Sequence, residues 1–230
     1  MSDISIVIPC YNESTNIPLL LERCAKSFID KPVEVIIVDN GSIDDTPAIL
    51  ERLLPQYSFA RSIRVEKNQG YGHGILSGLA VAKSSYIGWT HADLQTDPAD
   101  VLKALKILHN TNELLFLKGS RYGRAPIDLL FTIGMSFFDS ILLKSRLWDI
   151  NAQPTIVPRS FFKDWENPPY DFSLDLFAYY MAKKKKLQVK RFSVFFGKRI
   201  AGDAHLKNLK AKIKYTFQTI KYSIFLMGNQ

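Results

Sequence analysis

Three oxygen-bearing side chains follow an apolar run near the middle of the chain. Asp93, Gln95 and Asp97 come directly after residues 86–90, which are typical of a strand, and Pro98 then opens a helical pattern. Ligands of open α/β sheets bind beyond the carboxyl ends of strands, and carboxylate or amide oxygens suit a hard cation that also takes substrate phosphates. The spacing therefore indicates a metal–diphosphate site. An ordinary turn in which Asp97 caps the helix explains the same residues.

Earlier strand-like runs have the same design. They cover residues 4–8, 33–38 and 63–65, and the second is nearly all apolar, as in a strand that is buried on both faces. Each leads into a polar or glycine-rich loop and then into a helical pattern, the third of which is expected over residues 75–82. Repeated strand–loop–helix units predict an α/β fold with a mostly parallel central sheet flanked by helices.

The loops carry short motifs in a fixed order. They are Pro9-x-Tyr-Asn-Glu13, Val38-Asp-Asn-Gly-Ser42, Asn68-x-Gly70, Ala92-Asp-Leu-Gln-x-Asp-Pro98, Gly119-Ser-Arg-Tyr122, Phe172-Ser-Leu-Asp175 and Arg199-x-x-Gly202. With them the chain resembles the family 2 glycosyltransferases, and within these the dolichyl-phosphate mannose synthase-like branch. The resemblance implies a GT-A fold, a nucleotide-diphospho-sugar donor and transfer of a hexosyl group with inversion of the anomeric centre.

The resemblance also implies roles for individual residues. On the donor side it assigns nucleotide-sugar binding to Pro9, Tyr11, Glu13, Asp39, Asn68, Gly70 and Asp93. It assigns a Mg²⁺ or Mn²⁺ ion to Asp93, Gln95 and His91, and catalytic roles to Asp175 and Arg199. In this role Arg199 would bind the leaving diphosphate as an additional cation. The alternative interpretation is that Arg199 is simply a solvated base in a Lys/Arg-rich stretch. Arg121 and Gln153 would bind the acceptor.

Two residues depart from the family pattern. His91 and Asn40 stand where the family usually has acids, and an imidazole suits Mg²⁺ less well than a carboxylate does. We expect activity to survive because Asp93 and Gln95 remain. A catalytically silent relative that binds sugar nucleotides, or a scaffold at a membrane surface, is the alternative.

Two residues separate the candidate acceptors. A polyprenyl phosphate is already an anion, and Arg121 would bind its phosphate, whereas a sugar hydroxyl of a cell-surface polysaccharide needs a positioned base. Asp175 matches the position of that base, although a surface carboxylate on a helix is an equally simple interpretation. We expect a lipid-linked acceptor, either a polyprenyl phosphate or a lipid-linked glycan.

The positive charge gathers at the C-terminal end. The formal net charge is +8, and residues 183–230 hold thirteen Lys and Arg against one acid. We expect residues 1–202 to form the GT-A domain and 203–230 a basic amphipathic helix, with an apolar stripe that runs from Leu206 to Met227. Three interpretations of this stripe are open: it packs on its own domain, it packs on a second subunit in a homodimer, or it lies in a membrane interface.

The remaining composition limits the classes of protein. No uncharged apolar run is long enough to span a membrane, and no N-terminal signal segment is evident. Two cysteines give no disulfide framework, and no nucleic-acid recognition motif stands out. We therefore expect a cytoplasmic protein that is peripheral at the inner face of the cell membrane and binds its anionic surface, with no nucleic-acid partner.

Overall fold

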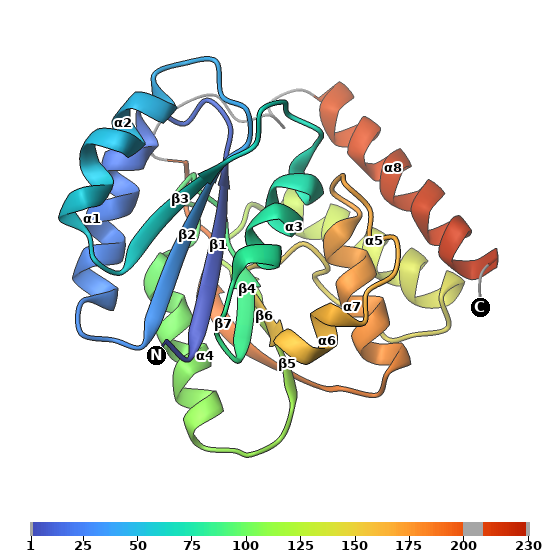
Figure 1. The fold of residues 1–230 in the computed structure, drawn as a ribbon. Helices are drawn as coiled ribbons and strands as arrows, with labels where there is room; N and C mark the ends of the chain where they lie inside the picture. The colour runs from blue at the N-terminus through green and yellow to red at the C-terminus, as the bar shows by residue number, and fades with distance from the viewer. Residues whose placement is uncertain (1, 200–208, 229–230) are drawn as a thin grey trace.

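The computed structural model describes residues 2–199 and 209–228 (Figure 1). Its strands are β1 (Ile4–Cys10), β2 (Val33–Asp39), β3 (Ala60–Arg64), β4 (Tyr86–Trp89), β5 (Leu115–Tyr122), β6 (Thr155–Pro158) and β7 (Gln188–Phe195). Its α-helices are α1 (Asn16–Phe28), α2 (Thr46–Leu53), α3 (Tyr71–Val81), α4 (Val101–His109), α5 (Pro126–Leu142), α6 (Arg159–Lys163), α7 (Leu174–Lys184) and α8 (Leu209–Gly228). Two short 3₁₀ helices are η1 (Leu54–Gln56) and η2 (Pro98–Asp100).

The strands form one sheet in the order β3-β2-β1-β4-β6-β5-β7. Only β6 runs antiparallel to its neighbours, so the expected α/β fold with a mostly parallel sheet is confirmed. Trp89 at the end of β4 pairs with Thr155 at the start of β6. The segment before β6 therefore emerges at the same edge of the sheet as the loops that follow β1, β2 and β4.

Helices cover both faces of the sheet (Figure 1). One face carries α1, α2 and α4, and the other carries α3, α6 and α7. The central strand β1 is buried almost throughout, as its apolar run predicts. In α1 the buried residues recur at the helical period, which fixes the face that packs on the sheet: Ile17, Leu20, Leu21, Cys24 and Phe28.

Two element boundaries differ from those expected. The strand expected over residues 63–65 is β3, which begins at Ala60, and α3 begins at Tyr71 rather than at residue 75. The glycines of this stretch have low helix propensity, which favours a loop when the sequence is considered alone. The glycines are needed because the start of α3 packs closely against the backbone of residues 169–171. A Cβ atom on Gly70, where φ is 118°, would lie 2.5 Å from the Tyr170 carbonyl oxygen.

The C-terminal helix α8 packs along α5 (Figure 1). Leu226 joins the main core on that side, and the buried Ser223 hydroxyl donates to Asp139 Oδ1 of α5 at 2.7 Å. Gly202, Leu206 and the expected domain boundary lie outside the described residues. In the part of the chain that the structure describes, no helix has the length and apolar character to cross a membrane.

The contact between α5 and α8 is expected to depend on pH. Burial raises the pKa of Asp139 to about 6 although the Ser223 hydrogen bond opposes this. The folded state therefore holds a proton that the unfolded chain releases between about pH 4 and pH 6, so stability falls as pH rises through this window. Asp139→Asn removes the buried charge, and we expect it to raise the unfolding midpoint at pH 8 more than at pH 4.

Thermal unfolding at both pH values measures this difference. Asp164→Asn is the matched control, because Asp164 pairs with Lys185 on the surface. An equal shift for Asp139→Asn at the two pH values would contradict the prediction.

Candidate functional site

The loop after β4 presents Asp93 at the carboxyl edge of the sheet. Its side chain is 15% exposed, and its Oδ1 accepts a hydrogen bond from the Gln95 backbone N–H at 3.2 Å. Gln95 also binds the segment after β7, because its Nε2 donates to the Gly197 carbonyl at 3.2 Å and its carbonyl accepts from the Gly197 N–H at 2.8 Å. These contacts bring the chain after β7 beside Asp93.

Arg199 lies in that segment between two of the predicted donor-side acids. Its Nη2 forms an ion pair with Glu13 Oε1, and its Nη1 lies 3.9 Å from Asp93 Oδ2. Glu13 is held in turn by the Asn16 side chain, which donates to Oε2 at 2.5 Å, and by the Thr46 hydroxyl, which accepts from its backbone N–H at 3.0 Å. The structure thus brings Glu13, Asp93 and Arg199 together. With its side chain 15% exposed, Arg199 is not the solvated base of the alternative.

Asp97 does not join this group. Its Oδ1 accepts from the Ala99 N–H at 3.0 Å and so caps η2, while its Oδ2 pairs with Arg23 at 3.0 Å. The ordinary interpretation of a helix cap is therefore confirmed for Asp97, whereas Asp93 faces Arg199.

Asp39 ends β2 and is 2% exposed. Its Oδ1 accepts from the Ser42 N–H at 2.9 Å. Its Oδ2 lies 3.2 Å from Arg64 Nη1, but in a geometry that makes no hydrogen bond. One carboxylate oxygen of Asp39 therefore keeps hydrogen-bonding capacity for a ligand N–H group, as the predicted nucleotide contact requires.

The other predicted nucleotide residues lie in neighbouring loops of the same edge. The Asn40 side chain donates to the Gly70 carbonyl at 3.0 Å, and the Asn68 side chain accepts from the Gly70 N–H at 2.9 Å. Asn40 thus ties the loop after β2 to the glycine-rich loop, a structural use for the amide that replaces the family acid. Pro9 lies within β1, and Tyr11 follows that strand.

His91 stacks against the aromatic wall of the site. Its ring centroid lies 5.9 Å from that of Tyr71, which in turn stacks on Phe172 at 4.5 Å. Among the residues that the structure describes, no three His, Cys, Asp or Glu side chains gather to hold a metal ion. Mg²⁺ is commonly held by one or two carboxylates together with substrate phosphates. Asp93 is therefore suited to hold an ion that a diphosphate also binds, rather than an ion held by protein side chains alone. The metal role of His91 stays a prediction.

Asp175 is buried in the first turn of α7. It is 2% exposed, so the alternative of a surface carboxylate is wrong. Trp89 Nε1 donates to its Oδ1 at 3.1 Å, and the Tyr71 hydroxyl donates to its Oδ2 at 3.4 Å. The predicted acceptor residue Gln153 joins this network, because its Nε2 also contacts the Tyr71 hydroxyl.

Lys118 of β5 is the cation of this network. Its side chain is fully buried, its Nζ donates to Thr155 Oγ1 at 2.9 Å, and it lies 3.7 Å from Asp175 Oδ1. Burial lowers the pKa of Lys118 to about 8, against the charge of Asp175, which raises it. Lys118 therefore places a positive charge next to Asp175, the predicted base.

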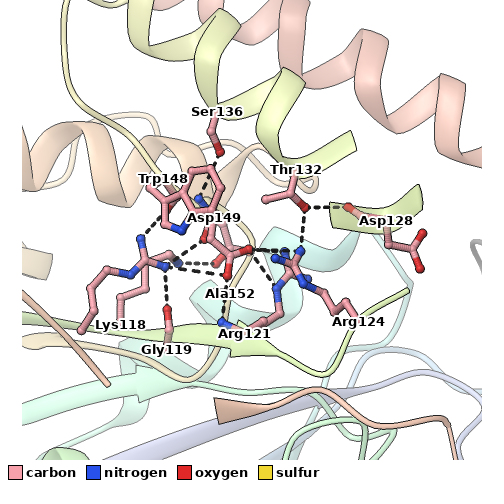
Figure 2. A network of polar contacts seen from close by, with 12 residues as sticks. Lys118, Gly119, Arg121, Arg124, Asp128, Thr132, Ser136, Trp148, Asp149 and Ala152 are labelled. Carbon is pink, nitrogen blue, oxygen red and sulfur yellow. Dashed lines mark hydrogen bonds and ion pairs between the residues drawn. The ribbon is translucent and has the colours of Figure 1, made fainter. Parts of the chain in front are cut away.

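Arg121, which is predicted to bind the acceptor, is paired with the buried carboxylate of Asp149. Its Nε and Nη2 both donate to Asp149 Oδ1, at 3.0 and 2.5 Å, and its backbone N–H donates to Oδ2 at 3.0 Å (Figure 2). Burial raises the pKa of Asp149, but the charge and hydrogen bonds of Arg121, with the charge of Arg124, outweigh it and lower the pKa. Asp149 is thus a buried anion that fixes Arg121.

A cavity of about 400 Å³ opens between these groups and the helices α5 and α8. Gln95, Arg121 and Phe172 line it from the sheet side, so it adjoins the loop that carries Asp93. A larger hollow of about 700 Å³, lined by residues such as Glu34 and Arg159, lies at the opposite edge, where β2 begins, and is remote from these loops. The smaller cavity is therefore the one that lies beside Arg121, a residue predicted to bind the acceptor.

Sequence reasoning missed several residues of the site. Lys118, Tyr71 and Arg124 belong to no motif that was singled out. A lysine within the apolar run of residues 115–119 is the one signal that the sequence offered, because a buried strand holds a charge only with a partner. The partner itself comes from a distant helix and is not visible in the sequence.

Comparisons with known proteins show the family to which the chain is similar. A family model described as "Glycosyl transferase family 2" matches residues 5–144. An uncharacterized protein of Methanocaldococcus jannaschii is 33% identical over 141 residues, which are 59% of this chain and 58% of that protein. An undecaprenyl-phosphate 4-deoxy-4-formamido-L-arabinose transferase of Serratia proteamaculans is 32% identical over 107 residues, 45% of this chain and 33% of the relative. The chain thus spans less than two thirds of these relatives.

A solved structure shares the fold. Glucosyl-3-phosphoglycerate synthase from Mycobacterium tuberculosis, in complex with Mn²⁺, UDP and glucosyl-3-phosphoglycerate, superposes with a TM-score of 0.74 at 18% identity. The match covers 98% of this chain and 80% of that one. At this identity the likeness concerns the fold.

Proposed function

The chain belongs to glycosyl transferase family 2, and we propose that it moves a sugar from a nucleotide-diphospho-sugar to a lipid-linked acceptor with inversion. The observation that carries this proposal is the convergence of Glu13, Asp93 and Arg199 at the sheet edge, next to a cavity lined by Arg121. The residues at the sheet edge suit a diphosphate. The cavity suits an acceptor that approaches from α5 and α8.

The donor half follows from the residues at the sheet edge. Asp39 would accept from an N–H group of the base, and Arg199, which is held by Glu13, would stabilise the charge that develops on the leaving diphosphate. Asp93, with Gln95 and His91 beside it, would hold Mg²⁺ or Mn²⁺. The ion would act as a Lewis acid on the phosphate oxygens.

The burial of Asp175 favours a phosphate acceptor. A general base must lie within hydrogen-bond reach of the hydroxyl that it deprotonates. Asp175 is 2% exposed, accepts from Trp89 and Tyr71, and lies beside Lys118. A phosphate monoester is already a nucleophile at neutral pH and needs no such base. A polyprenyl phosphate is therefore the acceptor that we propose, in line with the named substrate of the Serratia relative.

The surface formed by α5 and α8 supports a position at a membrane. The two helices expose large apolar side chains next to the cavity: Ile127, Leu130, Phe131, Phe137 and Ile141 on α5, and Phe217, Ile224 and Phe225 on α8. The chain carries a net charge of +8, which favours an anionic surface. We propose that this surface rests on the cytoplasmic face of the membrane, that residues 1–202 carry out catalysis, and that residues 203–230 share the membrane contact with α5.

A donor screen followed by a transfer assay tests the function. Thermal shifts with UDP-, GDP-, CDP- and dTDP-sugars, with and without Mn²⁺, identify the donor, because selective binding raises the unfolding midpoint. That donor is then incubated with undecaprenyl phosphate, and we expect a lipid-linked sugar. Binding of a donor without transfer to any acceptor would indicate a silent relative, and transfer to an oligosaccharide alone would overturn the lipid acceptor.

Replacing Asp175 separates the two acceptor chemistries. Asp175→Asn leaves Lys118 without its counter-ion, so it is combined with Lys118→Met to keep the buried charge balanced. We expect this double variant to retain transfer to undecaprenyl phosphate within about tenfold, whereas loss of a general base would cost about 10²–10⁴-fold. Turnover of the folded double variant, with Lys118→Met as its control, decides between them.

A further inference from the structure

Three arginines surround the single carboxylate of Asp149 (Figure 2). Arg121 Nη2 lies 2.5 Å from Oδ1, Arg124 Nη1 lies 3.5 Å from the same oxygen, and Arg191 Nη2 lies 4.0 Å from Oδ2. Asp149 is fully buried, so its charge is not shared with solvent. One anion thus stands against three cations, and the nearest of these, Arg121, forms its hydrogen bonds.

Arg191 is held by backbone carbonyls through its two Nη atoms, although its Nε, like that of Arg124, is buried without a hydrogen-bond partner. Its Nη2 donates to the Gly119 carbonyl at 2.6 Å, and its Nη1 contacts the Trp148 carbonyl. Arg191 therefore has a structural role that joins β7 to β5 and to the loop before β6. Arg191 does not line the cavity of about 400 Å³, whereas Arg124 does, so Arg124 is the arginine with an unpartnered Nε that a ligand in this cavity can reach.

Arg124 is buried with a donor left over. Its side chain is 5% exposed, and its Nη1 donates to Thr132 Oγ1 at 2.6 Å. Its Nε is buried and has no hydrogen-bond partner, a costly arrangement for a charged group. Figure 2 shows the Asp128 carboxylate pointing away from this guanidinium.

The Arg124 side chain, whose Nε has no hydrogen-bond partner, lines the cavity of about 400 Å³. Arg124 shares this cavity with Phe131 and Met135 of α5 and with Phe172, so a cation and apolar side chains face the same space. A ligand that satisfies all of them carries an anionic head and an apolar tail. A phosphate monoester of a long-chain alcohol has this form.

We propose that Arg124, not Arg121, donates to the anionic head of the acceptor, and that Arg121 is a positioning residue that holds Asp149 and the loop before β6. This inference rests on the proposed function, because it assigns the cation of the same acceptor site. If Arg124 has this role, the site prefers a prenyl phosphate over the uncharged prenyl alcohol, and this preference depends on the Arg124 side chain.

Binding of geranylgeranyl phosphate and of geranylgeraniol tests the assignment. Both are titrated by calorimetry into the full chain in detergent, with Mn²⁺ and the nucleoside diphosphate that the donor screen identifies. We expect Arg124→Gln to reduce the preference for the phosphate by about 10- to 100-fold, as the loss of a charge-assisted hydrogen bond implies. Arg146→Gln, which removes an exposed cation in the loop after α5, is expected to leave the preference unchanged.

The outcomes distinguish this inference from the function beneath it. A wild-type protein with no preference for the phosphate would overturn both. A wild-type preference that Arg124→Gln retains, while Arg121→Gln abolishes it, would overturn the assignment to Arg124 alone. Circular dichroism and a cooperative thermal unfolding transition confirm that each variant is folded. If Arg124→Gln does not fold, Arg124→Lys keeps the charge but loses Nε, and an unchanged preference in that variant would equally overturn the assignment.

Discussion

Asp93→Ala is expected to reduce sugar transfer by about 10²–10³-fold while leaving the fold intact, a loss typical of removing one preorganised group that stabilises charge in the transition state. The physical reason is the position of this carboxylate. It is the acid at the end of β4 that faces Arg199, and it is the side chain best suited to hold a divalent cation against a diphosphate. Its removal would leave the leaving group with Arg199 alone.

Turnover with saturating donor, with and without Mn²⁺, measures this effect. Asp97→Asn is the matched control, because it lies in the same loop and asparagine keeps the cap of η2. We expect excess EDTA to bring the wild-type rate down to the level of Asp93→Ala and to change that variant little. Full wild-type turnover in EDTA, or unchanged turnover in Asp93→Ala, would exclude the metal role.

Asp149→Ala is expected to lower the free energy of unfolding by about 3–5 kcal/mol, the cost of breaking a buried ion pair by removing one partner. Arg121 would lose both side-chain hydrogen bonds, and Arg124 and Arg191 would lose the only carboxylate that lies within 4.0 Å of them among the described residues. The pKa of Asp149 is lowered in the folded state, so its stabilisation is fully present at neutral pH and is lost as pH falls through that lowered pKa.

Urea unfolding at pH 7 measures the loss. Asp164→Ala, which removes an exposed ion pair with Lys185, is the control and is expected to change the free energy of unfolding by less than about 1 kcal/mol. An equally small effect for Asp149→Ala would show that the three guanidinium groups do not depend on this carboxylate.

The sequence predicted the fold where local patterns are strong. The run that became β2 is apolar almost throughout because the strand is buried on both faces, and no other element fits such a pattern at that length. The four-residue β6 was not predicted, since a short segment after a proline carries no periodic signal. Its direction depends on strands that are far away in the chain.

The candidate site was predicted in part for a similar reason. Glu13, Asp93 and Arg199 belong to motifs with a fixed order, and the structure brings them together. The partners of Asp175 and of Arg121 could not be predicted, because Lys118 and Asp149 are defined by packing between distant elements. The surface interpretation of Asp175 failed on the same ground, since a short helical pattern does not show which residues the neighbouring strands cover.

The direction of β6 has a consequence for how such a protein diversifies. Because β6 runs against β4, the loop before it reaches the edge at which the first strands end, so two consecutive stretches of the gene meet there. Apart from Arg199, the proposed donor contacts are encoded before residue 100, and apart from Gln95 the cavity is lined by residues encoded after residue 120. Under the proposed function, this division would let lineages remodel the second stretch and acquire new acceptors while the donor contacts are kept. The turn between α4 and β5 is a natural crossover point for chimeras within the family.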